Sequence, residues 1–193
     1  MTTYKQVDES CFALYDQVPQ RLMVHSVYQL ERPNRGLGGI HLVEAPVSTP
    51  WLKDFCVGED ESVSRWKDRW DLANWAFFMA FDGDKPVGAA TIASRTEGVN
   101  MLEGRDGLAV LWDLRVHDDH KQQGIGQMLF DMAKGWSRAQ DLAQLKIECQ
   151  NTNVPAVNFY HKQGGTLGKI DEYAYYTQPE YRHETQLIWY LSL

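Results

Sequence analysis

Cysteine is scarce in this chain, and its spacing matches neither a disulfide framework nor a metal site. The 193 residues include three cysteines, Cys11, Cys56 and Cys149, which are far apart and odd in number. None forms a C-x-x-C pair, the spacing typical of structural zinc sites and redox motifs. We therefore expect three reduced thiols, with no stabilising disulfides and no cysteine-bound zinc.

Long apolar runs and a targeting leader are also missing. No stretch reaches the roughly 18 consecutive apolar residues of a membrane-spanning helix. Residues 1–9 (MTTYKQVDE) are polar throughout, whereas a secretory leader is basic and then apolar. The sequence predicts a soluble cytoplasmic protein without a membrane partner.

Basic runs are the third absence. Lysine and arginine number 19 against 26 aspartates and glutamates, which gives a formal net charge of -7. This balance disfavours nucleic acid and anionic membranes as partners, and it is compatible with a cationic or amine substrate.

The most informative stretch present runs from Val110 to Trp136. Val110–Val116 is apolar and β-branched enough for a buried strand, and the next seven residues are polar. Gly124-Ile125-Gly126 then opens a helix with apolar residues on one stripe, namely Ile125, Met128, Leu129, Met132, Ala133 and Trp136. The first amides of a helix lack internal partners, and glycines let an anion approach them, so a phosphate site is one interpretation and a tight corner is the other.

Two familiar nucleotide motifs do not fit this turn. A dinucleotide fingerprint needs a third small residue where Leu129 stands, and a P-loop needs a Lys-Ser/Thr pair after its last glycine.

A second segment has its own helix signals. Leu145–Cys149 alternates like a strand, and Asn153 precedes a helix as an N-cap, with Pro155 in its first turn. Gly164-Gly165 should end that helix.

The remaining pattern predicts a mixed sheet. An Asp82-Gly83 turn joins the best hairpin, 75–81 with 87–93. Other expected elements are strands at 23–30, 40–45, 166–170 and 185–191, a hairpin connection or linker at 35–39, a helix at 61–72, loops marked by Pro46, Pro50 and Gly58, and a loop at 96–108. The fold class is α/β (α+β), with a mostly antiparallel central sheet flanked by helices.

Both segments resemble motifs of the GNAT superfamily of N-acetyltransferases. Leu114-Arg115-Val116, a polar loop and Lys121-Gln122-Gln123-Gly124-Ile125-Gly126 resemble its acyl-CoA-binding motif, except that Lys121 replaces arginine or glutamine. Asn153, Ala156, Phe159-Tyr160 and Gly164 resemble its next motif, with Gly165 in place of the usual aromatic residue. The resemblance implies one acyl-CoA N-acyltransferase domain over 1–193, although residues 1–74 match no motif.

The resemblance also implies how acetyl-CoA, the co-substrate, is held. The Leu114 amide would face the thioester oxygen, Val116 would bond the pantetheine arm, and Asn153 would lie near that arm. The pyrophosphate would bind the amides of Gln122, Gly124, Gly126 and Gln127, within a loop that also includes Lys121, Gln123 and Ile125. A bulge in the strand would expose amides that a regular ladder would occupy.

For catalysis, the resemblance implies Tyr160 as the acid for the departing thiolate and as a neighbour of the cofactor. Asp113 and Glu148 are the candidate bases, with a water chain as the alternative. His117 and His120 form an H-x-x-H pair, but no third ligand is evident, so we expect no metal.

The function implied is transfer of the acetyl group from acetyl-CoA to a small-molecule amine by direct attack on the thioester. Within the superfamily, residues 148–151, 159–160 and 188–190 resemble the streptothricin acetyltransferase type. Acetylation of a protein N-terminus or lysine and a non-catalytic acyl-CoA sensor are the alternatives. A homodimer is one option for the assembly.

Overall fold

The computed structural model describes residues 1–56 and 62–193, which form two compact units. The first unit comprises Met1–Arg21, Asp54–Ile147 and Ser192–Leu193, and the second comprises Leu22–Lys53 and Glu148–Leu191. Gly58, expected in a loop, and Glu61, expected to begin a helix, lie outside the described residues. The assignment of 1–193 to one domain stays a prediction.

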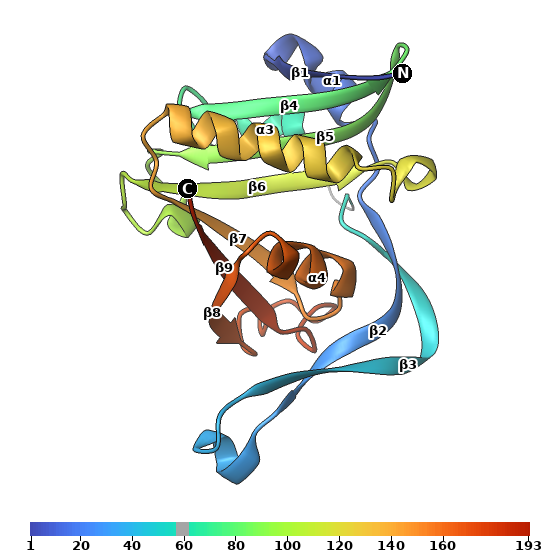
Figure 1. Cartoon of the computed structure of the whole chain (residues 1–193), viewed down its shortest axis with the longest axis vertical. Helices are drawn as coiled ribbons and strands as arrows, with labels where there is room; N and C mark the ends of the chain where they lie inside the picture. Colours follow the sequence, from blue (N-terminus) through green and yellow to red (C-terminus); the bar gives the residue numbers. More distant parts are fainter. Residues whose placement is uncertain (57–61) are drawn as a thin grey trace. The chain divides into compact units, whose positions relative to one another are not determined.

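The first unit is built on a sheet in the order β1-β4-β5-β6-β7 (Figure 1). Its antiparallel part is β1 (Thr2–Val7), β4 (Trp75–Asp82), β5 (Lys85–Ser94) and β6 (Leu108–Val116), and β7 (Gln144–Gln150) pairs with β6 in parallel. The predicted hairpin is confirmed as β4 and β5, with Gly83 at the turn. The polar sequence of β1 concealed it, because several of its side chains are exposed.

The described residues of this unit form the α-helices α1 (Phe12–Tyr15), α2 (Val63–Trp66) and α3 (Ile125–Ala139). The predicted helix at 61–72 is wrong in length, because α2 stops at Trp66 and turns follow it. The α3 prediction is confirmed, and the helix lies along β4, β5 and β6 (Figure 1). Its buried face differs from the predicted stripe at three positions, since Met128 is 47% exposed while Phe130 and Ser137 are buried.

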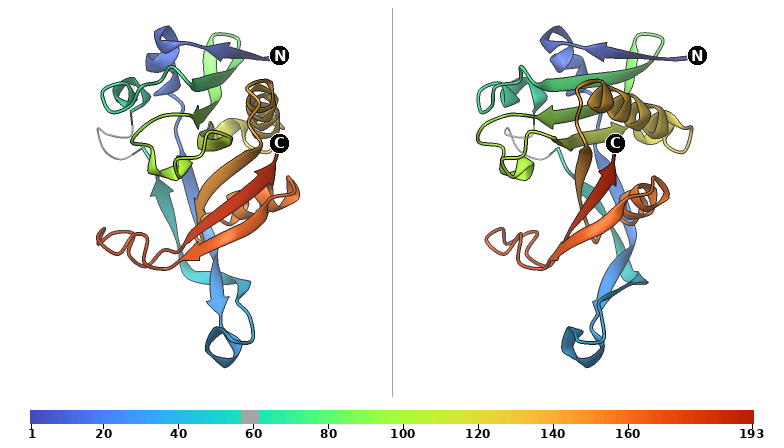
Figure 2. Two further views of the ribbon diagram at one scale, coloured as in Figure 1. Left: turned by 90° about the vertical axis from the view of Figure 1, so that its left-hand side faces the viewer. Right: turned by 60° about the vertical axis from the view of Figure 1, so that its left-hand side comes forward.

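The second unit contains a two-stranded ribbon of β2 (Arg21–Glu31) and β3 (His41–Asp54), with a short turn η2 (Pro33–Gly36) between them (Figure 2). It also contains the end of β7, α4 (Val154–Lys162), β8 (Thr166–Asp171) and β9 (Gln186–Ser192), in the strand order β7-β9-β8. The linker predicted at 35–39 lies within this hairpin connection.

The loops predicted at Pro46 and Pro50 are wrong, because both prolines lie inside β3. Proline cannot donate to a ladder, so it is confined to strands with an unpaired edge. A two-stranded ribbon has such an edge on each strand, and both prolines are exposed there.

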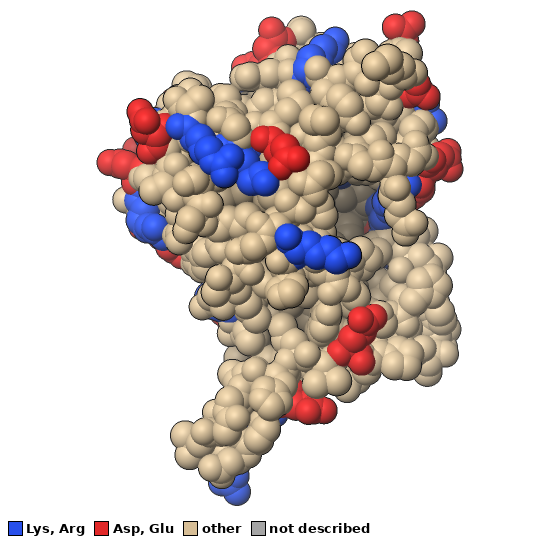
Figure 3. Space-filling view, viewed as in Figure 1, with Lys and Arg blue, Asp and Glu red and all other residues tan. Residues whose placement is uncertain are grey.

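The mixed, mostly antiparallel sheet with flanking helices confirms the predicted fold class. On the face drawn in Figure 3, basic and acidic side chains are interspersed. Lys134 and Asp131, for example, form an ion pair of 2.8 Å on α3. No helix in the described part of the chain is long and apolar enough to cross a membrane.

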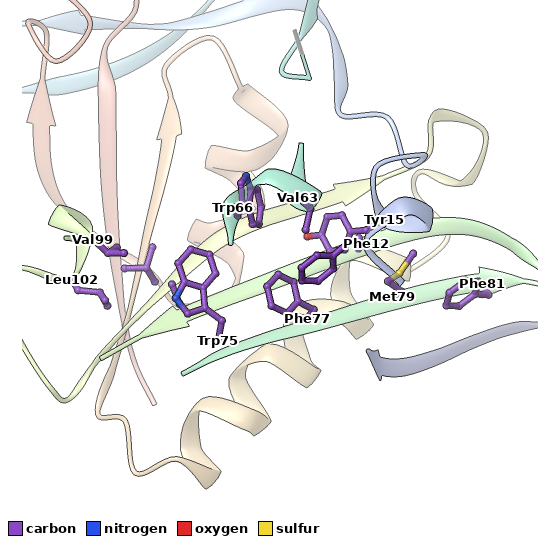
Figure 4. Packing of buried hydrophobic residues seen from close by; sticks show 13 residues of the cluster. Phe12, Tyr15, Val63, Trp66, Trp75, Phe77, Met79, Phe81, Val99 and Leu102 are labelled. Atoms are coloured by element: carbon purple, nitrogen blue, oxygen red, sulfur yellow. The ribbon is translucent and has the colours of Figure 1, made fainter. Parts of the chain in front are cut away.

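The main core lies on the face of the first unit's sheet that α1 and α2 cover. Odd-numbered residues of β4, Trp75, Phe77 and Met79, meet Phe12 and Trp66 there (Figure 4). The Phe12 and Phe77 rings lie 4.6 Å apart between centroids. The opposite face of the sheet belongs to α3, so β4 and β5 are buried on both sides.

Candidate functional site

The strand β6 contains the expected bulge, and Trp112 is the extra residue. Its register with β5 runs from Gly88↔Val116 to Thr91↔Asp113, and the next pair is Ile92↔Leu111. Trp112 therefore has no residue opposite it on β5, which is the geometry of a β-bulge.

Beyond this bulge, the amides of Leu114 and Val116 point away from β5. His117 N donates to the Val87 carbonyl at 2.9 Å, so bonded pairs fall on 117, 115 and 113, while 114 and 116 belong to the alternate pairs. On the other side of β6, the ladder with β7 covers only Leu108 to Leu111. Within the described residues, neither ladder uses these two amides.

The turn after β6 leads into the first turn of α3, where two glycines leave the backbone uncovered by side chains. Gly124, at the N-cap of α3, has φ +83°, and no side chain caps the helix. A side chain at Gly126 would contact only Val116 Cγ2, at 3.6 Å from the added Cβ. Ile125, between the two glycines, is buried. It packs so closely against Gly88 that a Cβ added there would lie 2.7 Å from Ile125 Cγ2. The chain's own packing does not require a glycine at 126, which fits a ligand approaching the backbone there.

The polar side chains of this turn bind within the protein. Lys121 Nζ donates to the Arg21 carbonyl and forms a 2.6 Å ion pair with Asp118. Gln123 Nε2 donates to the Asp119 carbonyl, and Gln127 Nε2 donates to Asp131. Gln122, with φ +61°, is exposed. The turn therefore presents backbone N–H groups, rather than charged side chains, to an anion.

The H-x-x-H pair has a local structural use. His117 Nδ1 accepts from Asp119 N at 3.3 Å and so caps a short 3-10 turn. Within the ranges that the structure describes, no three His, Cys, Asp or Glu residues are grouped so as to hold a metal ion.

Asp113, one of the candidate bases, lies in a buried network. Its Oδ2 accepts from Tyr15 Oη at 2.6 Å and from Arg115 Nε at 2.7 Å. The single hydroxyl proton of Tyr15 is used in the hydrogen bond to Asp113. The Thr91 hydroxyl, 2.8 Å from Tyr15 Oη, is therefore the donor in the bond between these two hydroxyls. Only 7% of Asp113 is exposed, so its carboxylate is enclosed by donors from the same unit.

The charges of this network stabilise one another. Burial works against the charged guanidinium of Arg115, but the carboxylate of Asp113 outweighs it and raises the pKa of Arg115 above its usual value. Burial, and then the charge of Asp113, raises the pKa of Tyr15, so the phenol keeps its proton. Arg115 also donates to the Val18 carbonyl at 3.3 Å. The geometry is that of a structural ion pair.

In the second unit, α4 carries Asn153 and Tyr160. The Asn153 side chain accepts from Ala156 N at 3.2 Å, which makes it the N-cap that the sequence predicts. Tyr160 is 7% exposed and stands edge-on to Phe159. Gly164, with φ +84°, ends the helix as predicted.

Gly165 replaces the aromatic residue of the motif for a steric reason. A Cβ there would lie 2.8 Å from the Tyr160 carbonyl and 3.1 Å from Leu191. The missing side chain lets the chain pass close to the end of α4, where Gly165 N donates to the same carbonyl.

Glu148, the other candidate base, lies in the second unit and is partly exposed. Its Oε1 accepts from Tyr175 Oη at 2.6 Å. Both candidate bases accept from a phenol, but Asp113 is buried and also bonded to an arginine, whereas Glu148 is partly exposed.

Sequence reasoning missed the partners of both carboxylates. The signal for Arg115 was present, because two opposite charges at alternate positions of an apolar strand indicate a buried pair. Tyr15 and Tyr175 lie 98 and 27 residues from their partners along the chain, so no local pattern linked them.

The chain is similar to known acetyltransferases. The family model described as "Acetyltransferase (GNAT) family" matches residues 46–165. Streptothricin acetyltransferase of Escherichia coli is 39% identical over 152 residues, or 79% of this chain and 76% of that protein. Streptothricin acetyltransferase A of Bacillus subtilis (strain 168) is 29% identical over 76% of each chain.

Solved structures show the same fold. The crystal structure of nourseothricin acetyltransferase has a TM-score of 0.76 at 20% identity, covering 99% of this chain and 98% of that one. A candidate streptothricin acetyltransferase from Bacillus anthracis strain Ames, in complex with acetyl coenzyme A, has a TM-score of 0.78 at 18% identity over the whole of both chains. The chain belongs to the acetyltransferase (GNAT) family.

Proposed function

We propose that this chain acetylates streptothricin or a small amine of the same class. The chain is an acetyl-CoA-dependent N-acetyltransferase for a small-molecule amine, and two relatives that match over three quarters of its length are named for streptothricin. The net charge of -7 is compatible with a cationic acceptor.

The observation that carries the proposal is the pair of outward amides after the bulge at Trp112. We assign the Leu114 amide to the thioester oxygen and the Val116 amide to the pantetheine arm, because neither ladder uses them. The open backbone at Gly124 and Gly126, with the amides of Gln122 and Gln127, would hold the pyrophosphate. When bound, acetyl-CoA supplies an activated acetyl thioester.

We assign the proton transfers to the second unit. Tyr160 would protonate the departing thiolate, since a phenol and a thiol have comparable pKa values. Glu148 would take the proton from the amine. Its carboxylate is partly exposed, and one of its oxygens accepts a hydrogen bond from Tyr175. Asp113 fits this role less well, since only 7% of it is exposed and its carboxylate already accepts hydrogen bonds from Tyr15 and Arg115.

Binding of acetyl-CoA is the first test. At about 100 times its Kd, a ligand adds roughly 2.7 kcal/mol to stability, which should raise the unfolding midpoint by about 5 to 11 °C. Thermal unfolding with and without acetyl-CoA measures this, and an unchanged midpoint at millimolar acetyl-CoA would remove the cradle assignment.

Acceptor identity is tested by release of the CoA thiol. We expect release with streptothricin, together with a product heavier by one acetyl group in mass spectrometry. Peptides with free N-termini or lysines serve as the contrasting acceptors. Release with peptides alone would point to a protein acetyltransferase, and binding of acetyl-CoA without release to any amine would point to a sensor.

The backbone cradle predicts unequal effects at the glycine turn. Gly126→Val should weaken acetyl-CoA binding by about 10- to 100-fold, the value of one charge-assisted hydrogen bond. Lys121→Ala should change it far less, because Lys121 Nζ is engaged by Asp118 and Arg21. Gly135→Val is the matched control, since it also lies on α3 with no atom within 4 Å of an added Cβ. Calorimetry on the three variants decides, and a larger loss from Lys121→Ala would assign the pyrophosphate to side-chain charge.

Location and assembly complete the proposal. The cysteines support a location in the cytoplasm, since Cys11, Cys56 and Cys149 are free thiols. Cell fractionation tests it. A homodimer stays a prediction, to be checked by sedimentation of the purified chain.

A further inference from the structure

Tyr175 contacts two residues of one strand in the second unit. Its hydroxyl donates to Glu148 Oε1 at 2.6 Å and accepts from Gln150 Nε2 at 3.2 Å. Glu148 and Gln150 are two residues apart on β7, so their side chains share a face of the strand. Because Gln150 donates to the phenol oxygen, the single phenol proton is directed at the carboxylate.

The phenol is well suited to remain a donor. Burial, and then the negative charge of Glu148, raises the pKa of Tyr175 above its usual value. Cys149 and Glu184 also interact electrostatically with this pair. Burial raises the pKa of Cys149 to about 12, so this thiol stays neutral. Glu184 is paired with Lys53, so its charge is balanced locally.

The segment between β8 and β9 is fixed in place by bonds other than the one to Glu148. Near its start, Tyr173 N donates to Asp171 Oδ1 at 2.9 Å. Near its end, the Glu184 carboxylate meets Lys53, and Thr185 N donates to Asn151 Oδ1 at 2.8 Å. Tyr173 and Tyr176 are 76% and 70% exposed, whereas Tyr175 turns inward to β7. The direction of Tyr175 is therefore specific within a segment rich in tyrosine.

We propose that Tyr175 is a positioning residue that fixes the rotation of the Glu148 carboxylate. This role rests on the proposed function of Glu148 as the base. With Oε1 held by the phenol, Oε2 is the oxygen that receives the amine proton, in a geometry set before the acceptor binds. General bases are effective when they are held in line with the proton they remove.

The kinetic test is Tyr175→Phe, which keeps the ring and removes the donor. We expect kcat to fall by about 10- to 100-fold, as for a misplaced reacting group, with the KM for acetyl-CoA unchanged. Tyr28→Phe is the matched control, since its hydroxyl donates to the neutral amide of Asn158 at 2.8 Å in the same unit.

A double variant separates positioning from packing. In a Glu148→Gln background, adding Tyr175→Phe should change kcat no further, because the group it positions is already gone. The proposal would be overturned if Tyr175→Phe lowered kcat as much in the Glu148→Gln background as in the wild type. It would also be overturned if Tyr175→Phe lowered only the unfolding midpoint, or if Tyr28→Phe lowered kcat by the same factor. A Glu148→Gln variant with wild-type kcat would remove the base itself and overturn the positioning role with it.

A measurement without turnover keeps the acceptor question separate. In the free protein, the carbon NMR chemical shift of the Glu148 carboxyl should change in Tyr175→Phe and stay at the wild-type value in Tyr28→Phe, because only the first variant loses the hydrogen bond to Oε1. If streptothricin is not acetylated, the acceptor assignment fails while this change still supports the contact. An identical signal in all three proteins would overturn the positioning role, whatever the acceptor is.

Discussion

Replacing Tyr160 by phenylalanine should leave acetyl-CoA bound and slow acetyl transfer by about 10²- to 10⁴-fold, the usual contribution of a general acid. The ring is 7% exposed and packs against Phe159, so phenylalanine keeps most of the packing while removing the proton donor. The loss should persist in single-turnover reactions at saturating amine, because the missing group acts in the chemical step.

The paired measurement is the unfolding midpoint and the single-turnover rate of Tyr160→Phe and the wild type. Phe159→Leu, one residue earlier on α4, is the control for disturbed packing of this helix. A lowered midpoint with an unchanged rate would make Tyr160 a core residue and remove the acid assignment. Binding of acetyl-CoA by calorimetry shows whether the cradle is intact in each variant.

Asp113→Ala should be strongly destabilising. It leaves the Arg115 guanidinium buried without its carboxylate, and breaking a buried pair in this way costs about 3 to 5 kcal/mol. For a chain of this size, the unfolding midpoint should fall by roughly 6 to 20 °C. Denaturant and thermal unfolding measure the change directly.

Tyr15→Phe is the matched variant for this network, since it removes one hydrogen bond to Asp113 and leaves the ion pair. Its cost should be smaller, about 1 to 3 kcal/mol. The opposite pattern for Asp113→Ala, a wild-type midpoint with a collapsed single-turnover rate, would assign the catalytic base to Asp113 and remove it from Glu148.

Local chemistry explains why several elements could be predicted from the sequence. The hairpin of β4 and β5 has an Asp-Gly turn between apolar runs, α4 has Asn153 as its cap and Gly164 at its end, and α3 follows a glycine turn. In each, neighbours along the chain determine the backbone. The bulge in β6 followed from the family resemblance, and only the register with β5 located it at Trp112.

Elements without such local signals were missed or misjudged. The ribbon of β2 and β3 tolerates Pro46 and Pro50 because its strands have unpaired edges, which no local pattern reveals. The settings of Asp113 and Glu148 depend on Tyr15 and Tyr175, which only folding brings near. The chemical roles assigned to these residues stay predictions.

Trp112 shifts the alternation of β6 by one position, and this single offset gives the strand two different uses. Before it, Leu111 lies opposite Ile92 and faces α3; after it, Asp113 lies opposite Thr91 and faces Tyr15. If Trp112 instead paired with Thr91 in a regular ladder, the side chains of Asp113 and Arg115 would turn toward α3. The amides of Leu114 and Val116 would then point at β5. A regular pairing of Trp112 would therefore invert the buried pair and the cradle together, so the register of β6 beyond Trp112 is under a stricter constraint than the identity of most of its side chains.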